Sequence, residues 1–195
     1  MMQKKEPVEI EVKIPVRDKE EVCRKLKENG FRQGITETET DTYFNSEQYD
    51  LKKRDKALRI RVTQDKKSGK CRTELNCKGP RLDKVSMSRK EIEISLEDSE
   101  KMSMILAELG FYPAGCTVKK QRTFFYGGRV TAAVDQVEGL GIFLELEILE
   151  EGEEKRTPCL REIEETMEKL GYQWKHTVRT SYLSMLEKEK NHAFR

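Results

Sequence analysis

The chain has 195 residues, with 38 Lys and Arg against 36 Asp and Glu, and a formal net charge of +2. This near balance argues against a dedicated nucleic-acid-binding protein, which is normally strongly basic, and the length is most simply that of one domain. No apolar run is long enough to cross a membrane, the N-terminus lacks a signal-peptide core, and five scattered cysteines form no C-x-x-C pair, so we expect a protein of the reducing cytoplasm.

The first predicted strand carries two carboxylates and an ammonium on one face. Glu9, Glu11 and Lys13 occupy alternate positions of VEIEVKIPV, and side chains two apart on a strand share a face. The residues between them are Val and Ile, which predicts an apolar opposite face. Glu145 and Glu147 repeat the pattern in a later strand. Two such rows of carboxylates indicate a hard divalent cation, Mg²⁺ or Mn²⁺.

The chain contains an internal repeat. Residues 9–44 and 91–125 each read as a strand, a helix, a Gly followed by Phe, and a second strand. Glu9 matches Glu91 at an offset of 82 residues, and the glycines match at an offset of 80. A third, partial copy consists of a helix, Leu-Gly-Tyr and the segment RTSYLSML, which we predict to be a strand. Each glycine stands where a helix C-cap needs a left-handed residue.

Basic side chains occupy the strands between these units. Arg59 and Arg61 share one face of LRIRV, Lys78 lies on a later strand, and Lys120 and Arg122 share a face of the segment 118–126. An open sheet with a solvated polar face would explain the alternation, and so would a closed barrel with its charges inside. Because acids and bases are sorted by strand, we favour the barrel.

About eight strands and three helices are predicted in all, an α+β pattern dominated by antiparallel hairpins. We expect residues 7–186 to form one domain, with tails at 1–6 and 187–195.

These charges suit a triphosphate. Such a ligand needs oxygens that bind its metal ion and Lys or Arg side chains for the phosphate oxygens that the metal does not neutralise. No activated Ser or Cys nucleophile and no Gly-rich phosphate loop is recognisable, so catalysis would rest on positioning and electrostatics.

The chain resembles the CYTH domains, the triphosphate tunnel metalloenzymes. Its Glu9-x-Glu11-x-Lys13 resembles their ExExK signature, and further matching segments follow in order. They are Thr40-Asp41-Thr42-Tyr43-Phe44, Leu58-Arg59-Ile60-Arg61, Cys77-Lys78-Gly79-Pro80, Arg89-x-Glu91-x-Glu93, Lys120-x-Arg122 and the stretch from Asp135 to Glu147. The resemblance covers residues 6–186, and the stretch from Asp135 is most similar to the class IV adenylyl cyclase (CyaB-like) branch.

The resemblance implies an eight-stranded antiparallel tunnel with flanking helices and inward charges. One or two Mg²⁺ or Mn²⁺ ions would be held by Glu9, Glu11, Asp135, Glu145 and Glu147. The triphosphate would be bound by Lys13, Arg59, Arg61, Lys78, Arg89, Lys120 and Arg122, of which Arg89 and Lys120 could also position the others. The catalytic set would be Lys13, Arg59, Arg122 and Asp135.

Several activities fit that resemblance. A cyclase converts ATP to cyclic AMP and pyrophosphate, and a triphosphatase hydrolyses tripolyphosphate, thiamine triphosphate or a nucleoside triphosphate. A His-Phe pair often precedes ExExK in the cyclase branch, whereas residues 3–7 here read QKKEP, so the triphosphatase stays an alternative. A non-catalytic triphosphate-binding module is a third possibility. The family also includes homodimers, and no nucleic-acid or membrane partner is expected.

Two further acidic pairs remain open. Glu91 and Glu93 fit a tunnel role and a solvated strand face equally well. Glu37 and Glu39 also alternate, but they lie outside the motif, so we expect them on the surface.

Overall fold

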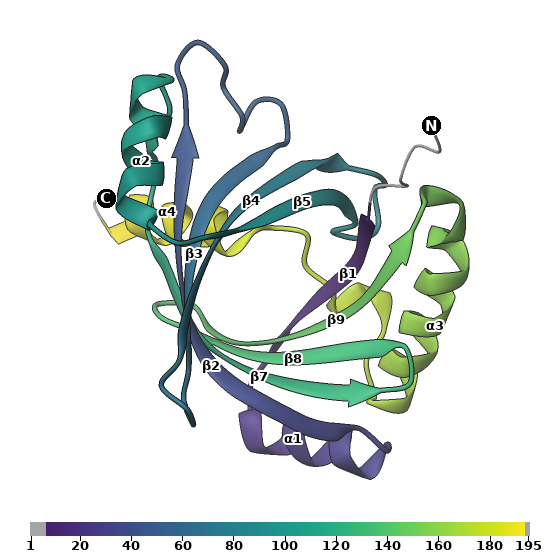
Figure 1. Ribbon diagram of the computed structural model, residues 1–195. Helices are drawn as coiled ribbons and strands as arrows, with labels where there is room; N and C mark the ends of the chain where they lie inside the picture. The colour runs from purple at the N-terminus through teal and green to yellow at the C-terminus, as the bar shows by residue number, and fades with distance from the viewer. Residues whose placement is uncertain (1–6, 194–195) are drawn as a thin grey trace.

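The computed structural model describes residues 7–193, in which eight antiparallel strands close into a barrel with helices packed around it (Figure 1). The strands are β1 (Pro7–Val16), β2 (Arg32–Asn45), β3 (Ala57–Asp65), β4 (Cys71–Arg81), β5 (Arg89–Leu96), β7 (Val118–Gly127), β8 (Val130–Val137) and β9 (Gly141–Glu151). Their order around the barrel is β3-β4-β5-β1-β9-β8-β7-β2, and pairing between β2 and β3 closes it. The two-residue strand β6 (Tyr112–Pro113) only adds to the end of β2. The predicted eight-stranded antiparallel barrel is confirmed.

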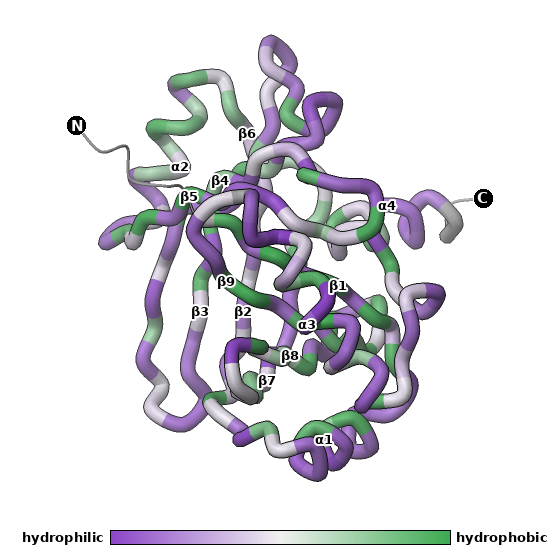
Figure 2. The backbone as a smooth tube through the Cα atoms, turned by 90° about the vertical axis from the view of Figure 1, so that its right-hand side faces the viewer, coloured by the Kyte–Doolittle hydropathy of each residue, from purple (hydrophilic) through white to green (hydrophobic). Residues whose placement is uncertain are grey.

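The alternation of side chains along the strands determines which face points inward. In β1, Val8, Ile10, Val12 and Ile14 are at most 1% exposed and belong to a hydrophobic core outside the barrel. The residues between them point into the barrel. The same alternation appears along the other strands as a change between hydrophobic and hydrophilic positions (Figure 2). Most of the apolar core therefore lies between strands and helices, and the barrel interior is polar.

Two helices cover the side of the barrel that contains β1, β8 and β9. They are α1 (Lys19–Glu28) and α3 (Arg156–Lys169). The side chain of Asp18 caps α1 by accepting a hydrogen bond of 3.0 Å from the backbone N–H of Glu21, which satisfies a donor that a helix start leaves free. Leu26 of α1 and Ile163 of α3 are fully buried in the core cluster of β1. No helix in the described part of the chain is long and apolar enough to cross a membrane.

The internal repeat appears as matching elements. Helix α2 (Ser99–Glu108) follows β5 as α1 follows β1, and it packs through Leu106 on Phe44 and Ile60. Gly30, Gly110 and Gly171 end their helices with φ between 81° and 84°, the left-handed conformation that glycine adopts without a steric penalty. The three predicted C-caps are confirmed.

The C-terminal segment differs from the prediction. RTSYLSML was expected to be a strand and residues 187–195 a tail, but α4 (Tyr182–Ala193) begins within the first and continues into the second. Short apolar segments fit both periods, and here Ser181 decides, because its hydroxyl accepts a hydrogen bond of 3.2 Å from the N–H of Ser184 and caps the helix. Residues 1–6, the predicted N-terminal tail, lie outside the described residues.

Candidate functional site

A cavity of about 480 Å³ opens into the barrel and is partly covered by α4. Its lining contains twelve Lys and Arg side chains but only six Asp and Glu. Ten of the twelve predicted site residues line it, namely Glu9, Glu11, Lys13, Arg59, Arg61, Lys78, Arg89, Lys120, Arg122 and Glu145. Of the other two, Asp135 contacts Arg122, and Glu147 pairs with Glu11 across β1 and β9. The barrel thus brings the predicted residues together, with an excess of positive charge.

The carboxylates of β1 and β9 differ in their surroundings. Burial alone would raise the pKa of Glu9, but the ammonium of Lys78, which bonds to it, lowers that pKa to about 2. Burial and the neighbouring Glu145 and Glu9 raise the pKa of Glu11 to about 8. Burial and Glu9 raise the pKa of Glu147 to about 7. Burial and neighbouring carboxylates together therefore disfavour the charged forms of Glu11 and Glu147.

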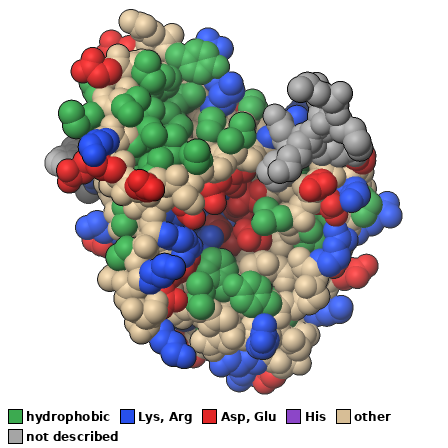
Figure 3. Space-filling view, viewed as in Figure 1, with side chains coloured by type: hydrophobic (Ala, Val, Ile, Leu, Met, Phe, Trp, Pro, Cys, Tyr) green, Lys and Arg blue, Asp and Glu red, His purple; other side chains and the backbone are tan. Residues whose placement is uncertain are grey.

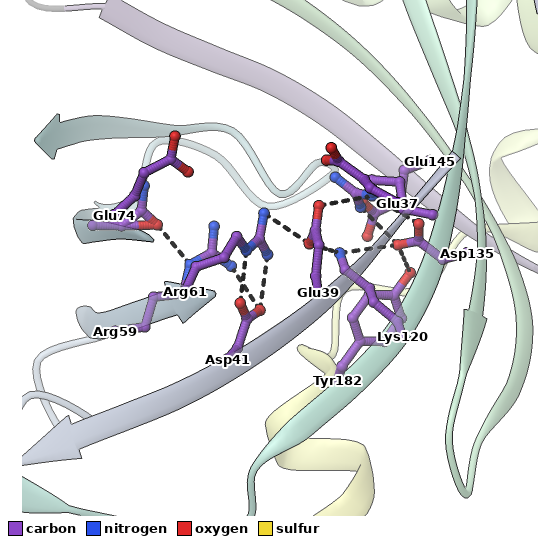
Figure 4. Close-up of polar contacts among 12 residues, drawn as sticks. Glu37, Glu39, Asp41, Arg59, Arg61, Glu74, Lys120, Asp135, Glu145 and Tyr182 are labelled. Atoms are coloured by element: carbon purple, nitrogen blue, oxygen red, sulfur yellow. Dashed lines mark hydrogen bonds and ion pairs between the residues drawn. The ribbon is translucent and has the colours of Figure 1, made fainter. Parts of the chain in front are cut away.

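A second group of charges surrounds Asp135, which is fully buried. The guanidinium of Arg122 donates two hydrogen bonds to its carboxylate, at 2.7 and 2.6 Å, and also contacts Glu145. Lys120 Nζ lies 3.2 Å from Asp135 Oδ2, and the hydroxyl of Tyr182 donates to the same oxygen at 3.1 Å (Figure 4). Three side chains thus donate to Asp135, so its carboxylate positions Arg122 and Lys120 and is less available as a metal ligand.

Tyr182 joins α4 to the barrel interior and was not predicted as a site residue. Its ring lies 4.0 Å from Nζ of Lys13, a distance typical of a cation–π contact, and meets the ring of Phe143 edge-on at 5.0 Å. Tyr182 was not placed at the site because the segment RTSYLSML was predicted to be a strand.

Strand β2 contributes two acids, Asp41 and Glu39, that were not among the predicted site residues. Asp41 accepts hydrogen bonds from Nε and Nη2 of Arg61, at 2.6 and 2.8 Å, and from Nη1 of Arg59 at 3.3 Å. Glu39, expected on the surface, is 2% exposed and lies 2.9 Å from Arg61 and 3.1 Å from Lys120. Burial would raise the pKa of Glu39, yet Arg61 and its neighbours lower it to about 2.

Glu37 was likewise expected on the surface, and this expectation is wrong. It is fully buried and accepts two hydrogen bonds from Arg72, at 2.8 and 2.9 Å. Both errors have one cause: the two residues were expected on the surface because they lie outside the motif, but in a closed barrel the whole polar face of β2 points inward. Asp41 belongs to the segment TDTYF, and that motif was the available signal for its importance.

Three charged residues of β5, Glu91, Glu93 and Arg89, differ in their contacts. Glu91 points inward, 3.2 Å from Lys78, and Glu93 accepts a hydrogen bond from Asn76 nearer the rim. Arg89 donates to the backbone carbonyl of Asp55, in the loop before β3, at 2.8 Å and to that of Gly79 in β4 at 3.0 Å. Arg89 therefore anchors the cavity mouth, and its guanidinium is less free for phosphate than the other predicted bases.

The donor set fits a hard divalent cation by its chemistry. Glu9, Glu11 and Glu147 offer carboxylate oxygens, the ligands that Mg²⁺ and Mn²⁺ prefer, and a bound cation would favour the charged forms of Glu11 and Glu147, whose pKa values are raised by burial and by neighbouring carboxylates. Among residues 7–193, however, no three His, Cys, Asp or Glu side chains are already gathered in a metal-binding arrangement. The carboxylates would have to reorient around an ion.

Comparison with known proteins gives a consistent result. The family model described as "CYTH domain" matches residues 7–182. A Methanocaldococcus jannaschii protein named "Putative adenylate cyclase MJ0240" is 36% identical over 178 residues, which are 91% of this chain and 98% of that protein. "Adenylate cyclase CyaB" of Aeromonas hydrophila is 27% identical over 150 residues, 76% of this chain and 72% of that protein.

Solved structures agree in fold. A Pyrococcus horikoshii protein is 32% identical, with a TM-score of 0.84 over 93% of this chain and 99% of its own. A Hippeastrum protein described as a "putative adenylyl cyclase" with "a dominant" triphosphatase activity has a TM-score of 0.62 at 18% identity, over 94% of this chain and 96% of its own. At that identity the second likeness concerns the fold alone.

Proposed function

The chain belongs to the CYTH domain family, and from that premise we propose that it is a divalent-metal-dependent enzyme that acts on a triphosphate inside its barrel. The observation that carries this proposal is the cavity lining, in which Lys and Arg outnumber Asp and Glu by twelve to six. Closely spaced cations in a cavity with low-dielectric walls attract a polyanion more strongly than they would in bulk water.

The bases would bind the phosphate chain. Arg59, Arg61 and Arg122 present planar guanidinium groups, which suit phosphate oxygens, and Lys13 of β1 and Lys120 of β7 add point charges. Each of these side chains is paired with a buried carboxylate in the structure. A triphosphate would exchange these internal partners for its own oxygens, so little cationic charge would have to be newly buried on binding.

The metal ion would be held by Glu9, Glu11 and Glu147, and it would supply positive charge that offsets the charge of the phosphate oxygens. Asp135 and Glu145, also predicted as ligands, would act first by orienting Arg122, Lys120 and Lys13. Charge that develops on the leaving phosphate oxygens would meet fixed guanidinium and ammonium donors, which is how phosphoryl transfer is commonly accelerated.

We infer that the reaction is that of a class IV adenylyl cyclase, in which the 3′-hydroxyl of ATP attacks the α-phosphorus and pyrophosphate leaves. The names of the two relatives support this choice. So does the cavity, because Tyr43, Leu51 and Met87 line it together with the bases and offer apolar surface to a nucleoside. Triphosphate hydrolysis is the alternative, since the bases need no nucleoside and a protein of the same fold is described with that activity.

Product analysis would test the proposal. The purified chain is incubated with Mg²⁺ or Mn²⁺ and, separately, ATP, GTP, tripolyphosphate and thiamine triphosphate, and the products are resolved by ion-exchange chromatography. Cyclic AMP with pyrophosphate would establish the cyclase, and orthophosphate without a cyclic nucleotide would establish the triphosphatase. Binding without any product would refute catalysis.

A matched pair of variants would test the site itself. We expect Glu11→Gln to abolish turnover while the fold is retained, because the core face of β1 is untouched. Glu162→Gln, on the outside of the barrel in α3, is the control and should keep full activity. Equal activity in both variants would refute the assignment of Glu11.

A further inference from the structure

Asn76 of β4 is a buried amide among the charged side chains of the cavity. It is 2% exposed and lines the cavity together with Arg59. Strand pairing places it opposite Arg59 of β3 on one side and Glu93 of β5 on the other. Its Oδ1 accepts a hydrogen bond of 2.6 Å from Nε of Arg59, and its Nδ2 donates one of 2.5 Å to Oε2 of Glu93. Asn76 therefore connects a predicted phosphate-binding base to a carboxylate of the next strand.

Arg59 is held differently from the other two arginines that are proposed to bind phosphate. Arg61 and Arg122 each donate two hydrogen bonds of 2.6 to 2.8 Å to a single carboxylate. The contacts of Arg59 with carboxylates are longer, 3.3 Å to Asp41 and 3.8 Å to Glu91, and its closest contact, at 2.6 Å, is with a neutral amide. Because the attraction between opposite charges weakens with distance, the positive charge of Arg59 is the least compensated of the three.

The hydrogen-bonding capacity of an amide explains why Asn suits this position. The Nε–H of Arg59 can only donate and the ionised carboxylate of Glu93 can only accept, whereas an amide has both an acceptor and donors. One orientation of the amide therefore satisfies both neighbours. An ionised Asp would accept from Arg59 but could not donate to Glu93. Glu93 itself is exposed and does not line the cavity, so the amide holds Arg59 while the negative charge stays outside the cavity.

We propose that Asn76 is a positioning residue for triphosphate binding, which fixes the guanidinium of Arg59 and leaves its positive charge available to a phosphate oxygen. This inference rests on the proposed function. A phosphate that approaches Arg59 displaces long contacts with carboxylates, whereas at Arg61 or Arg122 it must replace a carboxylate held by two short hydrogen bonds. Arg59 is therefore the arginine that a triphosphate binds with the smallest loss of existing ion pairs.

Exchanging the amide and the carboxylate tests this inference. The double variant Asn76→Asp/Glu93→Gln keeps the net charge and both hydrogen bonds, since the new carboxylate accepts from Arg59 and from the new amide. The negative charge moves, however, from the exposed position on β5 to the buried one on β4. Acidic and basic side chains already lie close together in the hollow of the barrel (Figure 3). A further carboxylate beside Arg59 would offset its positive charge and repel an anion.

Isothermal titration calorimetry with tripolyphosphate in EDTA measures binding without metal-dependent turnover. We expect the dissociation constant of the double variant to rise by on the order of 10-fold, because a negative charge is placed within a few ångströms of the ligand. Its melting temperature should stay close to that of the wild type, because each hydrogen bond is replaced. For a triphosphate that the wild type turns over in Mg²⁺, the same loss should appear as an increase in KM. A purely structural role of Asn76 would leave the dissociation constant and KM unchanged.

The matched control is Glu28→Gln/Asn29→Asp, which makes the same two kinds of substitution at the exposed C-terminal end of α1. Neither residue lines the cavity, so the dissociation constant for tripolyphosphate should not change. A second variant, Asn76→Ala, removes the hydrogen-bond acceptor of Arg59 without adding a charge. It should weaken binding several-fold, because the guanidinium is no longer fixed.

The outcomes separate this inference from the proposed function. A double variant that binds tripolyphosphate as tightly as the wild type would overturn the role of Asn76 and leave the proposed function intact. Unchanged binding by Asn76→Ala would likewise show that the amide does not position Arg59. A wild-type chain that does not bind tripolyphosphate would overturn both the proposed function and this inference.

Discussion

Asp41 provides the sharpest test of the charge network, since the prediction concerns a residue whose partners only the folded barrel reveals. Its side chain is almost fully buried and accepts hydrogen bonds from Arg61 at 2.6 and 2.8 Å and from Arg59 at 3.3 Å. Burial alone would raise its pKa, but the two guanidinium groups hold the pKa of Asp41 well below its usual range. The substitution Asp41→Asn keeps the shape and removes the charge, which leaves two buried cations short of an anion.

The expected cost follows from those contacts. Removing one partner of a buried ion pair typically destabilises a protein by about 3–5 kcal/mol, and the loss should fall near the lower value because Glu39 also lies beside Arg61. For a domain of this size, each kcal/mol lowers the melting temperature by roughly 2–4 °C. We therefore expect Asp41→Asn to unfold about 10 °C below the wild type.

Thermal unfolding followed by circular dichroism measures this difference, with and without tripolyphosphate. Because a phosphate chain supplies the missing negative charge, tripolyphosphate should raise the melting temperature of Asp41→Asn more than that of the wild type. The control is Asp98→Asn, at the N-cap of α2, where Asn caps as well as Asp and little change is expected. A shift in Asp41→Asn as small as that of the control would refute the idea that Asp41 is the internal counter-ion of these arginines.

Three further outcomes are expected. The pKa values of Glu11 and Glu147 are raised to about 8 and about 7, so the folded metal-free chain keeps protons that the unfolded chain releases near the ordinary carboxylate pKa. The free energy of unfolding should therefore fall as pH rises from about 4.5 to 8. Melting temperatures in EDTA at several pH values measure the fall, and a flat profile would contradict it. Mg²⁺ at pH 8 should stabilise the wild type clearly more than Glu11→Gln, and an equal melting shift for both would argue against Glu11 as a ligand. Tyr182→Phe keeps the ring over Lys13 and loses the hydrogen bond to Asp135, which should cost about 1–2 kcal/mol in chemical unfolding, so a loss well above that range would show that the hydroxyl does more than hold Asp135.

Much of this architecture could be predicted from the sequence because strand alternation is a local property. The row of Glu9, Glu11 and Lys13 was visible in nine residues, and its neighbours on β9 repeated it. What could not be predicted is which charges meet inside the closed barrel. Glu39 was expected on the surface because it lies outside the motif, and only the closed barrel, with β2 paired to β3 and β7, shows which bases it meets.

The same reasoning explains why α4 was missed. Its first residues fit both a strand and a helix, and the choice is made by the cap at Ser181 and by contacts with the barrel. Tyr182 could therefore be placed beside Asp135 only by the three-dimensional structure. A row of charges can be predicted from the sequence of one strand, whereas the ion-pair partner of each charge lies on strands that are distant in sequence.

The apolar core outside the barrel explains how the fold can tolerate a charged interior. Buried ion pairs are weak sources of stability, because the desolvation of two charges can exceed their attraction. In this chain the apolar residues of β1 and the helices α1 and α3 form a continuous core outside the barrel, which is where hydrophobic burial stabilises the fold. The interior is thereby released from a packing role, and its acids can hold the bases in position until a polyanion replaces them. On this account, substitutions such as Ile10→Ala should lower the free energy of unfolding by about 2–5 kcal/mol, whereas Glu11→Gln should leave the chain folded and inactive.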